Sequence, residues 1–204
     1  YIATYITTRF IKRGLKKFFD DDKKEMPKLP NKSISLILSV IISLISSNFI
    51  TEKVMLAFNT AWFGVYDPIF NMDVGYYMFQ KPFIETIIIY FIALLAIYSI
   101  YIAVYYIIVF NKYFEKGIDR ATLKKNTFIK QLGVNVILVV LGLAAITLVK
   151  VQDIVNSKFL TLSDGTNLYG AGLIEATIKT WGYRIFACII LLAAIMAVSY
   201  THLR

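Results

Sequence analysis

Long apolar runs alternate with shorter polar segments along the chain, and this pattern predicts an all-α, polytopic membrane helical bundle. The runs cover residues 33–50, 84–110 and 132–149, and another begins at residues 185–198. A helix rises 1.5 Å per residue, so about 20 residues cross a hydrocarbon core about 30 Å thick. The first three runs are long enough or nearly so to span, the fourth is cut short before its length can be judged, and residues 1–10 are expected to end a further span.

The polar segments differ in charge, and the difference predicts their sidedness. Residues 9–32 carry nine Lys or Arg and residues 111–130 carry six, whereas residues 51–82 carry only Lys53 and Lys81. Basic residues next to spans favour the cytoplasmic side. We therefore expect residues 11–32 and 111–130 to be cytoplasmic, and residues 51–82 and 152–184 to be extracytoplasmic, in a cell-membrane protein.

Composition agrees with a membrane protein: 58% of residues are hydrophobic, 17% are charged, and the mean hydropathy is +0.64. The net charge of +9 comes from bases that cluster beside apolar runs, which predicts contact with the bilayer and its anionic lipid headgroups rather than with nucleic acid. Cys188 and His202 are single residues of their kind, so we expect neither a disulfide nor a Cys/His metal cluster.

Residues 67–83, DPIFNMDVGYYMFQKPF, crowd acids, prolines and aromatics between two apolar runs. Asp67 and Pro68 suit a helix start, and Asp73 suits the cap of a following turn. The alternative is a hard cation at the membrane surface, for which two carboxylates are an incomplete shell. With Tyr76, Tyr77 and Pro82, the segment is predicted to form an amphipathic elbow at the outer leaflet.

The second outer segment contains a predicted turn at residues 163–165 and then YGAG, which includes Tyr169, Gly170 and Gly172. The YGAG stretch lacks the third glycine and the lysine of a nucleotide loop, so a tight turn is preferred. Residues 174, 178, 181 and 185 are spaced like one face of an amphipathic interfacial helix. No HExxH, GxSxG or Cys/His pattern occurs, so we expect no enzyme activity, cofactor, metal or catalytic residue in this chain.

Two polar stripes run along the predicted spans. Serines recur every four residues at 35, 39, 43 and 47, and tyrosines at 90, 98, 101 and 105 fall within one helical face. Helix packing and interfacial anchoring are the favoured interpretations. A polar conduit or a ligand-lining face is the alternative, although charge inside the spans is limited to Glu85 near an outer boundary, which disfavours an ion-coupled transporter.

Residues 61–83, AWFGVYDPIFNMDVGYYMFQKPF, closely resemble the signature of uncharacterised protein family 0182. The matching positions are Asp67, Pro68, Ile69, Phe70, Asp73, Tyr77, Phe79, Pro82 and Phe83. Tyr76 stands where phenylalanine is usual, and Asn71 where glycine is common. The stretch Tyr169–Gly172 is a second match, after which residues 173–175 depart from the family pattern of an aromatic, a threonine and an aspartate.

The resemblance implies a large bacterial or archaeal membrane protein with a multi-span N-terminal region and a large extracytoplasmic portion, whose activity is not established. We therefore expect residues 1–204 to be a fragment of one transmembrane domain that anchors such a portion. Residues 199–204 resemble translated adapter sequence and are not expected to be native. Alternatives are a transporter or channel component and, ranked lower, the handling of lipid or cell-wall precursors.

Overall fold

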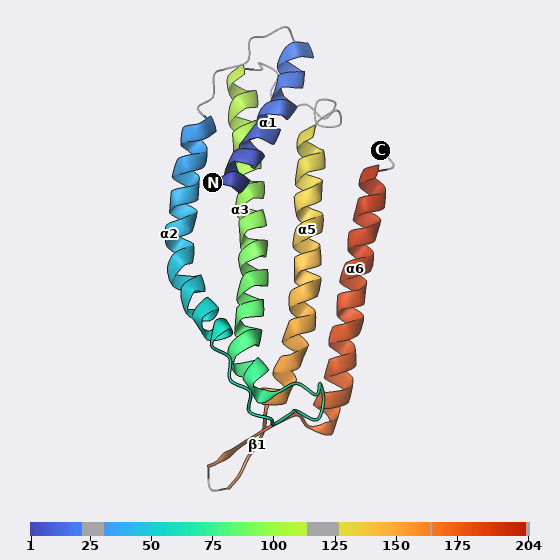
Figure 1. Cartoon of the computed structure of the whole chain (residues 1–204). Coiled ribbons are helices and arrows are strands. Elements are labelled where there is room, and N and C mark those ends of the chain that lie inside the picture. Colours follow the sequence, from blue (N-terminus) through green and yellow to red (C-terminus); the bar gives the residue numbers. More distant parts are fainter. Residues whose placement is uncertain (22–30, 114–126, 164, 203–204) are drawn as a thin grey trace. The chain divides into compact units, whose positions relative to one another are not determined.

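A computed structural model describes residues 1–21, 31–113, 127–163 and 165–202 (Figure 1). Its fold class is the predicted one, a bundle of helices. The elements are α1 (Ile2–Asp21), α2 (Asn31–Phe58), the π-helical turn η1 (Tyr76–Gln80), α3 (Lys81–Tyr113), α5 (Thr127–Lys150), the 3₁₀ turn η2 (Val151–Asn156), β1 (Lys158–Thr161), β2 (Asn167–Tyr169), the π-helical turn η3 (Glu175–Lys179) and α6 (Thr180–His202).

Four helical segments of the described chain have the length and apolar composition needed to cross a membrane. They are Lys32–Phe58, Tyr76–Val109, Gln131–Asn156 and Glu175–Met196. Each covers all or nearly all of one predicted run and extends well beyond it at one end at least, because the helices continue through isolated charges such as Glu52 and Lys53. The helix α1 is not among the four, and the expectation that residues 1–10 end a further span stays a prediction.

The segment around residue 178 is not a separate interfacial helix, because it continues without a break through η3 into α6. A short antiparallel hairpin, β1 with β2, was not predicted from sequence. Its turn was predicted: Gly165 donates its N–H to the Leu162 carbonyl at 3.0 Å and has a φ of +83° that favours glycine. Asp164, which belongs to the predicted turn, lies outside the described residues.

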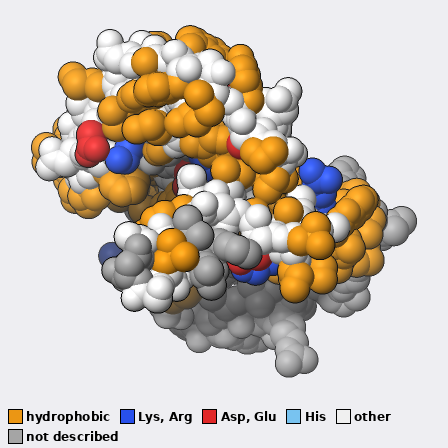
Figure 2. Space-filling model, turned by 90° about the horizontal axis from the view of Figure 1, so that it is seen from below, with side chains coloured by type: hydrophobic (Ala, Val, Ile, Leu, Met, Phe, Trp, Pro, Cys, Tyr) orange, Lys and Arg blue, Asp and Glu red, His pale blue; other side chains and the backbone are white. Residues whose placement is uncertain are grey.

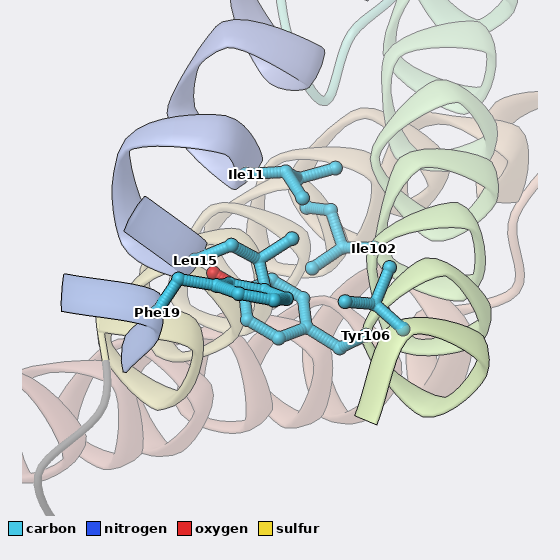
Figure 3. Close-up of a cluster of buried hydrophobic side chains, with 6 residues drawn as sticks. Ile11, Leu15, Phe19, Ile102 and Tyr106 are labelled. Carbon is cyan, nitrogen blue, oxygen red and sulfur yellow. The ribbon is translucent and has the colours of Figure 1, made fainter. Parts of the chain in front are cut away.

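The chain divides into two compact units. The first comprises Tyr1–Asn48 and Ala93–Val136, and the second comprises Phe49–Ile92 and Ile137–Arg204. The core of the first unit lies between α1 and α3, where Ile11, Leu15 and Phe19 pack against Ile102 and Tyr106 (Figure 3). Residues spaced by four lie on one face of a helix, so the apolar stripe of α1 fixes which side of this helix is buried.

Hydroxyl groups extend the buried face of α1 in the first unit. The Thr8 hydroxyl lies 3.2 Å from the Ser35 hydroxyl and 3.4 Å from the Tyr101 hydroxyl. Thus one member of each predicted polar stripe takes part in a contact between helices. Ser43 and Ser47, at the far end of the serine stripe, have exposed side chains.

Candidate functional site

The loop between α2 and η1 folds back on itself through backbone hydrogen bonds. Val74 donates to the Val65 carbonyl at 2.9 Å, and Asp67 donates to the Met72 carbonyl at 3.0 Å. Asn71, at the tip of this return, has a φ of +55°, in the left-handed region that asparagine tolerates. The predicted amphipathic elbow is therefore a closed loop that leads into a helix.

Asp67 is 7% exposed, and its carboxylate holds the return of the loop together. One oxygen accepts the N–H groups of Ile69 and Phe70 at 2.9 and 2.7 Å. The other accepts the Met72 N–H at 2.9 Å and the Tyr77 hydroxyl at 2.8 Å. Asp67 and Pro68 begin a single turn and not a helix, so the expected helix start is wrong in this detail, while the expected capping of free amides is observed.

Asp73 is 2% exposed and closes the other side of the loop. Its carboxylate accepts N–H groups from Gly75 at 2.7 Å, Gly64 at 2.8 Å and Phe63 at 3.2 Å. Because helical structure begins at residue 74, the bond from Gly75 places Asp73 at the helix cap that the sequence predicts. Asp73 also ties this cap to the chain ten residues upstream.

The same contacts set the acidity of both groups. Burial raises the pKa of Asp67, but its hydrogen-bond donors lower this pKa by more, so the net shift is downward. These donors are the N–H groups of Phe70 and Met72, the Tyr77 hydroxyl and the Ile69 N–H. Burial likewise raises the pKa of Asp73, and its backbone N–H donors, first that of Gly75, bring it below the ordinary value. Both carboxylates are therefore ionised in the folded loop at neutral pH.

The geometry bears on the alternative of a bound cation. All four carboxylate oxygens of Asp67 and Asp73 accept at least one N–H group, so a metal ion would have to displace donors that the loop itself supplies. Within the described residues, no group of three or more His, Cys, Asp or Glu side chains is placed to hold a metal ion.

Gly75 is required by close packing inside the loop. A Cβ atom at this position would lie 2.1 Å from the Ala61 carbonyl oxygen and 2.9 Å from an Asp73 oxygen. Any other residue would push the helix cap at Asp73 away from the chain at Ala61. The fold of the loop therefore needs both Gly75 and Asp73.

Lys81 lies one turn after the loop and is 6% exposed. Its ammonium group pairs with Glu85 at 2.6 Å and also with Asp153 of η2. Tyr76 donates its hydroxyl to Gln152, the neighbour of Asp153, at 3.0 Å. Pro82 stands within the first turn of α3, and because proline clashes with the carbonyl four residues earlier, it accounts for the widened π-helical turn at residues 76–80.

The YGAG segment is anchored to the residue that follows η2. Ser157 accepts the Gly170 N–H on its carbonyl at 2.8 Å, and its hydroxyl donates to Glu175 at 2.9 Å. Glu175 also accepts the Gly172 N–H at 3.4 Å. Gly170 has a φ of +142°, which explains the glycine, whereas the Tyr169 side chain is exposed.

The two predicted sites, the segment at residues 67–83 and the YGAG segment, are therefore linked through η2 and the residue after it. Sequence reasoning missed Gln152, Asp153 and Ser157 as partners. The spacing of Lys81 and Glu85 is the i, i+4 spacing of helical ion pairs and could have been recognised. The partners in η2 lie more than 70 residues from Tyr76 and Lys81, and no local pattern indicates them.

Apolar side chains are exposed on both segments that are predicted to be extracytoplasmic. Exposed members of the first are Trp62, Phe63, Val65 and Tyr66, and those of the second are Leu173, Ile174, Ile178 and Trp181. Figure 2 shows hydrophobic side chains over much of the described surface in view, with few charged ones. The buried aspartates thus stabilise a loop whose outer surface is aromatic and uncharged.

Comparisons with known proteins agree with the family resemblance. The sequence profile of an uncharacterised protein family (UPF0182) matches residues 8–204. A UPF0182 protein of Caldicellulosiruptor saccharolyticus is 28% identical over 123 residues, which are 58% of this chain and 13% of the relative. A UPF0182 protein of Clostridium novyi is 33% identical over 129 residues, 60% of this chain and 13% of the relative.

A third relative, a UPF0182 protein of Clostridium tetani, is 26% identical over 178 residues, which are 81% of this chain and 19% of the relative. The chain therefore spans less than a fifth of the length of these curated relatives. No solved structure matches the chain.

Proposed function

The chain belongs to the uncharacterised protein family UPF0182, and from that premise we propose that it is the membrane-anchoring part of a larger envelope protein. The observation that carries the proposal is the surface of the four long helices. Apolar side chains such as Leu44, Ile45 and Leu192 are more than half exposed, although they lie in the middle of helices long enough to span. Such a surface is stable in lipid and not in water.

In this proposal residues 11–32 and 111–130 are cytoplasmic and contact anionic lipid headgroups, while residues 51–82 and 152–184 are extracytoplasmic. The missing remainder of the protein continues into an extracytoplasmic domain, and the two outer segments support it. The chain itself performs no catalytic step and binds no nucleic acid. The length of the relatives supports this division, because it leaves most of the protein outside the matched region.

Membrane insertion is tested by washing membranes of cells that express the chain with alkaline carbonate, which strips peripheral proteins. We expect the chain to stay in the membrane pellet. Recovery in the wash would contradict an anchoring role.

Sidedness is tested by cysteine labelling in a Cys188→Ala background, which removes the cysteine of the chain. Ser163→Cys and Lys12→Cys place a thiol at exposed positions of the hairpin turn and of α1. A membrane-impermeant maleimide should label Ser163→Cys in intact cells and Lys12→Cys only after permeabilisation. The reverse pattern would overturn the assigned topology.

A second candidate function is a transporter or channel component. The observation that favours it is the buried cluster of hydroxyl groups of Thr8, Ser35 and Tyr101 in the first unit, which joins both polar stripes. Thr8→Val removes one hydroxyl at nearly constant volume. Thr7→Val, at the adjacent and partly exposed position of the same helix, is the matched control. Flux through the full-length protein that falls only with Thr8→Val would support a conducting role, and equal flux in both variants would remove it.

A further inference from the structure

The orientation of α1 in the first unit is fixed by its buried stripe. Thr4, Thr8, Ile11, Leu15 and Phe19 are all at most 1% exposed. The last three pack on Ile102 and Tyr106 of α3 (Figure 3). The opposite side of α1 therefore faces away from this core and is free to meet something else.

That opposite side carries a groove of about 320 Å³, lined by Ile6, Arg9, Phe10 and Arg13. Arg9 and Arg13 are one helical turn apart, as are Ile6 and Phe10, so the two pairs form adjacent rows along the helix. Ile6 is 45% exposed and Phe10 is 49% exposed. The groove thus places two guanidinium groups beside an exposed apolar strip.

The two guanidinium groups have no carboxylate partner among the described side chains. The ion pairs found there involve Lys53, Lys81 and Lys179 and neither of these arginines. A comparable groove of about 300 Å³ at the start of α6 contains Lys179, whose charge is paired with Glu175. Of these two grooves, the one on α1 places positive charge without an acidic partner among the described side chains beside apolar side chains.

Guanidinium groups bind phosphate oxygens through parallel N–H bonds, and a pair one turn apart can hold one phosphate group between them. A free phosphate or a nucleic acid backbone would leave Ile6 and Phe10 in water. A phospholipid would use both rows, with its phosphate on the arginines and the first part of its acyl chains on the apolar strip. The location agrees, since the segment after α1 leads directly to the helix of the first spanning segment, which begins at Lys32.

We propose that this groove is a binding site for an anionic phospholipid, with Arg9 and Arg13 holding the phosphate and Ile6 and Phe10 contacting the acyl chains. The site rests on the proposed membrane location of the chain and makes it more specific. Its role is to hold α1 on the membrane surface through a single lipid, in addition to the diffuse attraction of the other basic residues.

The test uses the chain in nanodiscs that contain phosphatidylglycerol and phosphatidylcholine in equal amounts, followed by release into detergent and identification of retained lipid by native mass spectrometry. Arg9→Gln with Arg13→Gln should lower the preference for phosphatidylglycerol about tenfold. The matched control, Lys12→Gln with Lys16→Gln, removes the same charge from exposed positions of the same helix outside the groove. It should lower the preference less than about threefold.

An equal loss of phosphatidylglycerol preference in the two double variants would show that diffuse electrostatic attraction, and not a specific site, selects the lipid. An unchanged preference in the arginine variant would also overturn the proposed site. Circular dichroism of both variants should match the parent chain, because all four side chains are exposed. Nanodiscs of phosphatidylcholine alone separate the two proposals. Both the membrane proposal and the lipid site are supported if all variants insert into phosphatidylcholine alone and only the arginine variant loses lipid selectivity in the mixed nanodiscs. Failure of the parent chain to insert contradicts the membrane proposal and the lipid site together.

Discussion

At the scale of single residues, the loop between α2 and η1 depends on a few groups that each make several contacts. Asp67 and Asp73 together accept several N–H groups, whose residues lie between Phe63 and Gly75 in the sequence. Gly75, which has no Cβ atom, leaves room for both the cap and the Ala61 carbonyl. A buried carboxylate with several donors is stabilising only while it is charged and fully satisfied. The contacts of the loop therefore give both aspartates of the family pattern a structural role.

Asp67→Asn should destabilise the loop, because the amide nitrogen presents hydrogens toward N–H groups that need an acceptor. We expect a loss of about 1 to 3 kcal/mol in the free energy of unfolding, measured by chemical denaturation in detergent. Tyr77→Phe removes one donor and leaves the backbone donors in place, so its effect should be smaller. An Asp67→Asn variant as stable as the parent would contradict the role given to this carboxylate.

The lowered pKa values of both aspartates predict a loss of loop structure in acid. A group whose folded pKa is depressed contributes its stability above its ordinary pKa, here 3.8, and loses it as the pH falls through the folded pKa. In a Trp181→Phe background, the fluorescence of the exposed Trp62 should stay constant from neutral pH to about pH 5 and change only below about pH 4. A change centred near neutral pH would contradict ionised, hydrogen-bonded aspartates.

Gly75→Ala should disrupt the loop, because the added Cβ would overlap the Ala61 carbonyl. Gly182→Ala in α6 is the control, since nothing lies within 4 Å of its added Cβ and alanine favours a helix by about 1 kcal/mol. Limited proteolysis between residues 59 and 75 should increase in the first variant and stay unchanged in the second. Equal protection of both would show that the loop can move away without loss of structure.

At the scale of elements, α3 and α6, which follow the two segments predicted to be extracytoplasmic, both begin after a π-helical turn. A carboxylate accepts an N–H group beside each turn: Asp73 accepts from Gly75, and Glu175 accepts from Gly172. The short element η2 contacts the first beginning through Tyr76 and Lys81. Ser157, the residue after η2, bonds Gly170 ahead of the second. With Ser157, this element of six residues contacts both segments predicted to be extracytoplasmic.

The sequence predicts the central parts of these elements much better than their ends. Uncharged runs identify the spans because only helices satisfy their backbone in lipid. The ends were placed at the first charges, yet α2 continues to Phe58 since Glu52 and Lys53 are tolerated on an exposed helix face. The acidic positions of the candidate site were predicted, whereas the role of η2 depends on contacts between distant parts of the chain, which no local pattern contains.

Lys81→Met should destabilise the junction of α3 with η2, because it leaves Glu85 and Asp153 facing each other without a cation. Removal of one partner from a buried ion pair costs several kcal/mol, and the partial exposure of Asp153 reduces our expectation to about 2 kcal/mol. Lys53→Met breaks an exposed pair with Glu52 and should cost less than about 0.5 kcal/mol. Thermal unfolding in detergent measures both, and equal effects would contradict a special role for Lys81.

At the scale of the whole molecule, α1 is followed along the chain by two consecutive pairs of helices, α2 with α3 and α5 with α6, and each pair is joined by one of the two segments predicted to be extracytoplasmic. Contacts between α3 and α5 occur within each compact unit. In the first unit Asn135 donates to the Ser99 hydroxyl at 3.2 Å. In the second unit Gly142 leaves room for Ile92, which would lie 2.7 Å from an added Cβ atom. The two pairs are thus held by packing and hydrogen bonds as well as by the connecting chain.

This arrangement predicts that residues 1–113 and 127–204, produced as separate polypeptides in one cell, associate in the membrane. A tag on the first piece should recover the second, because small residues allow close helix approach and interhelical hydrogen bonds add to it. Gly142→Leu should abolish the recovery by forcing α5 away from Ile92, while Val136→Leu, at an exposed position of the same helix, should leave it unchanged. If the unmodified pieces do not associate, the connection between α3 and α5, and not their contact surface, holds the helical pairs together.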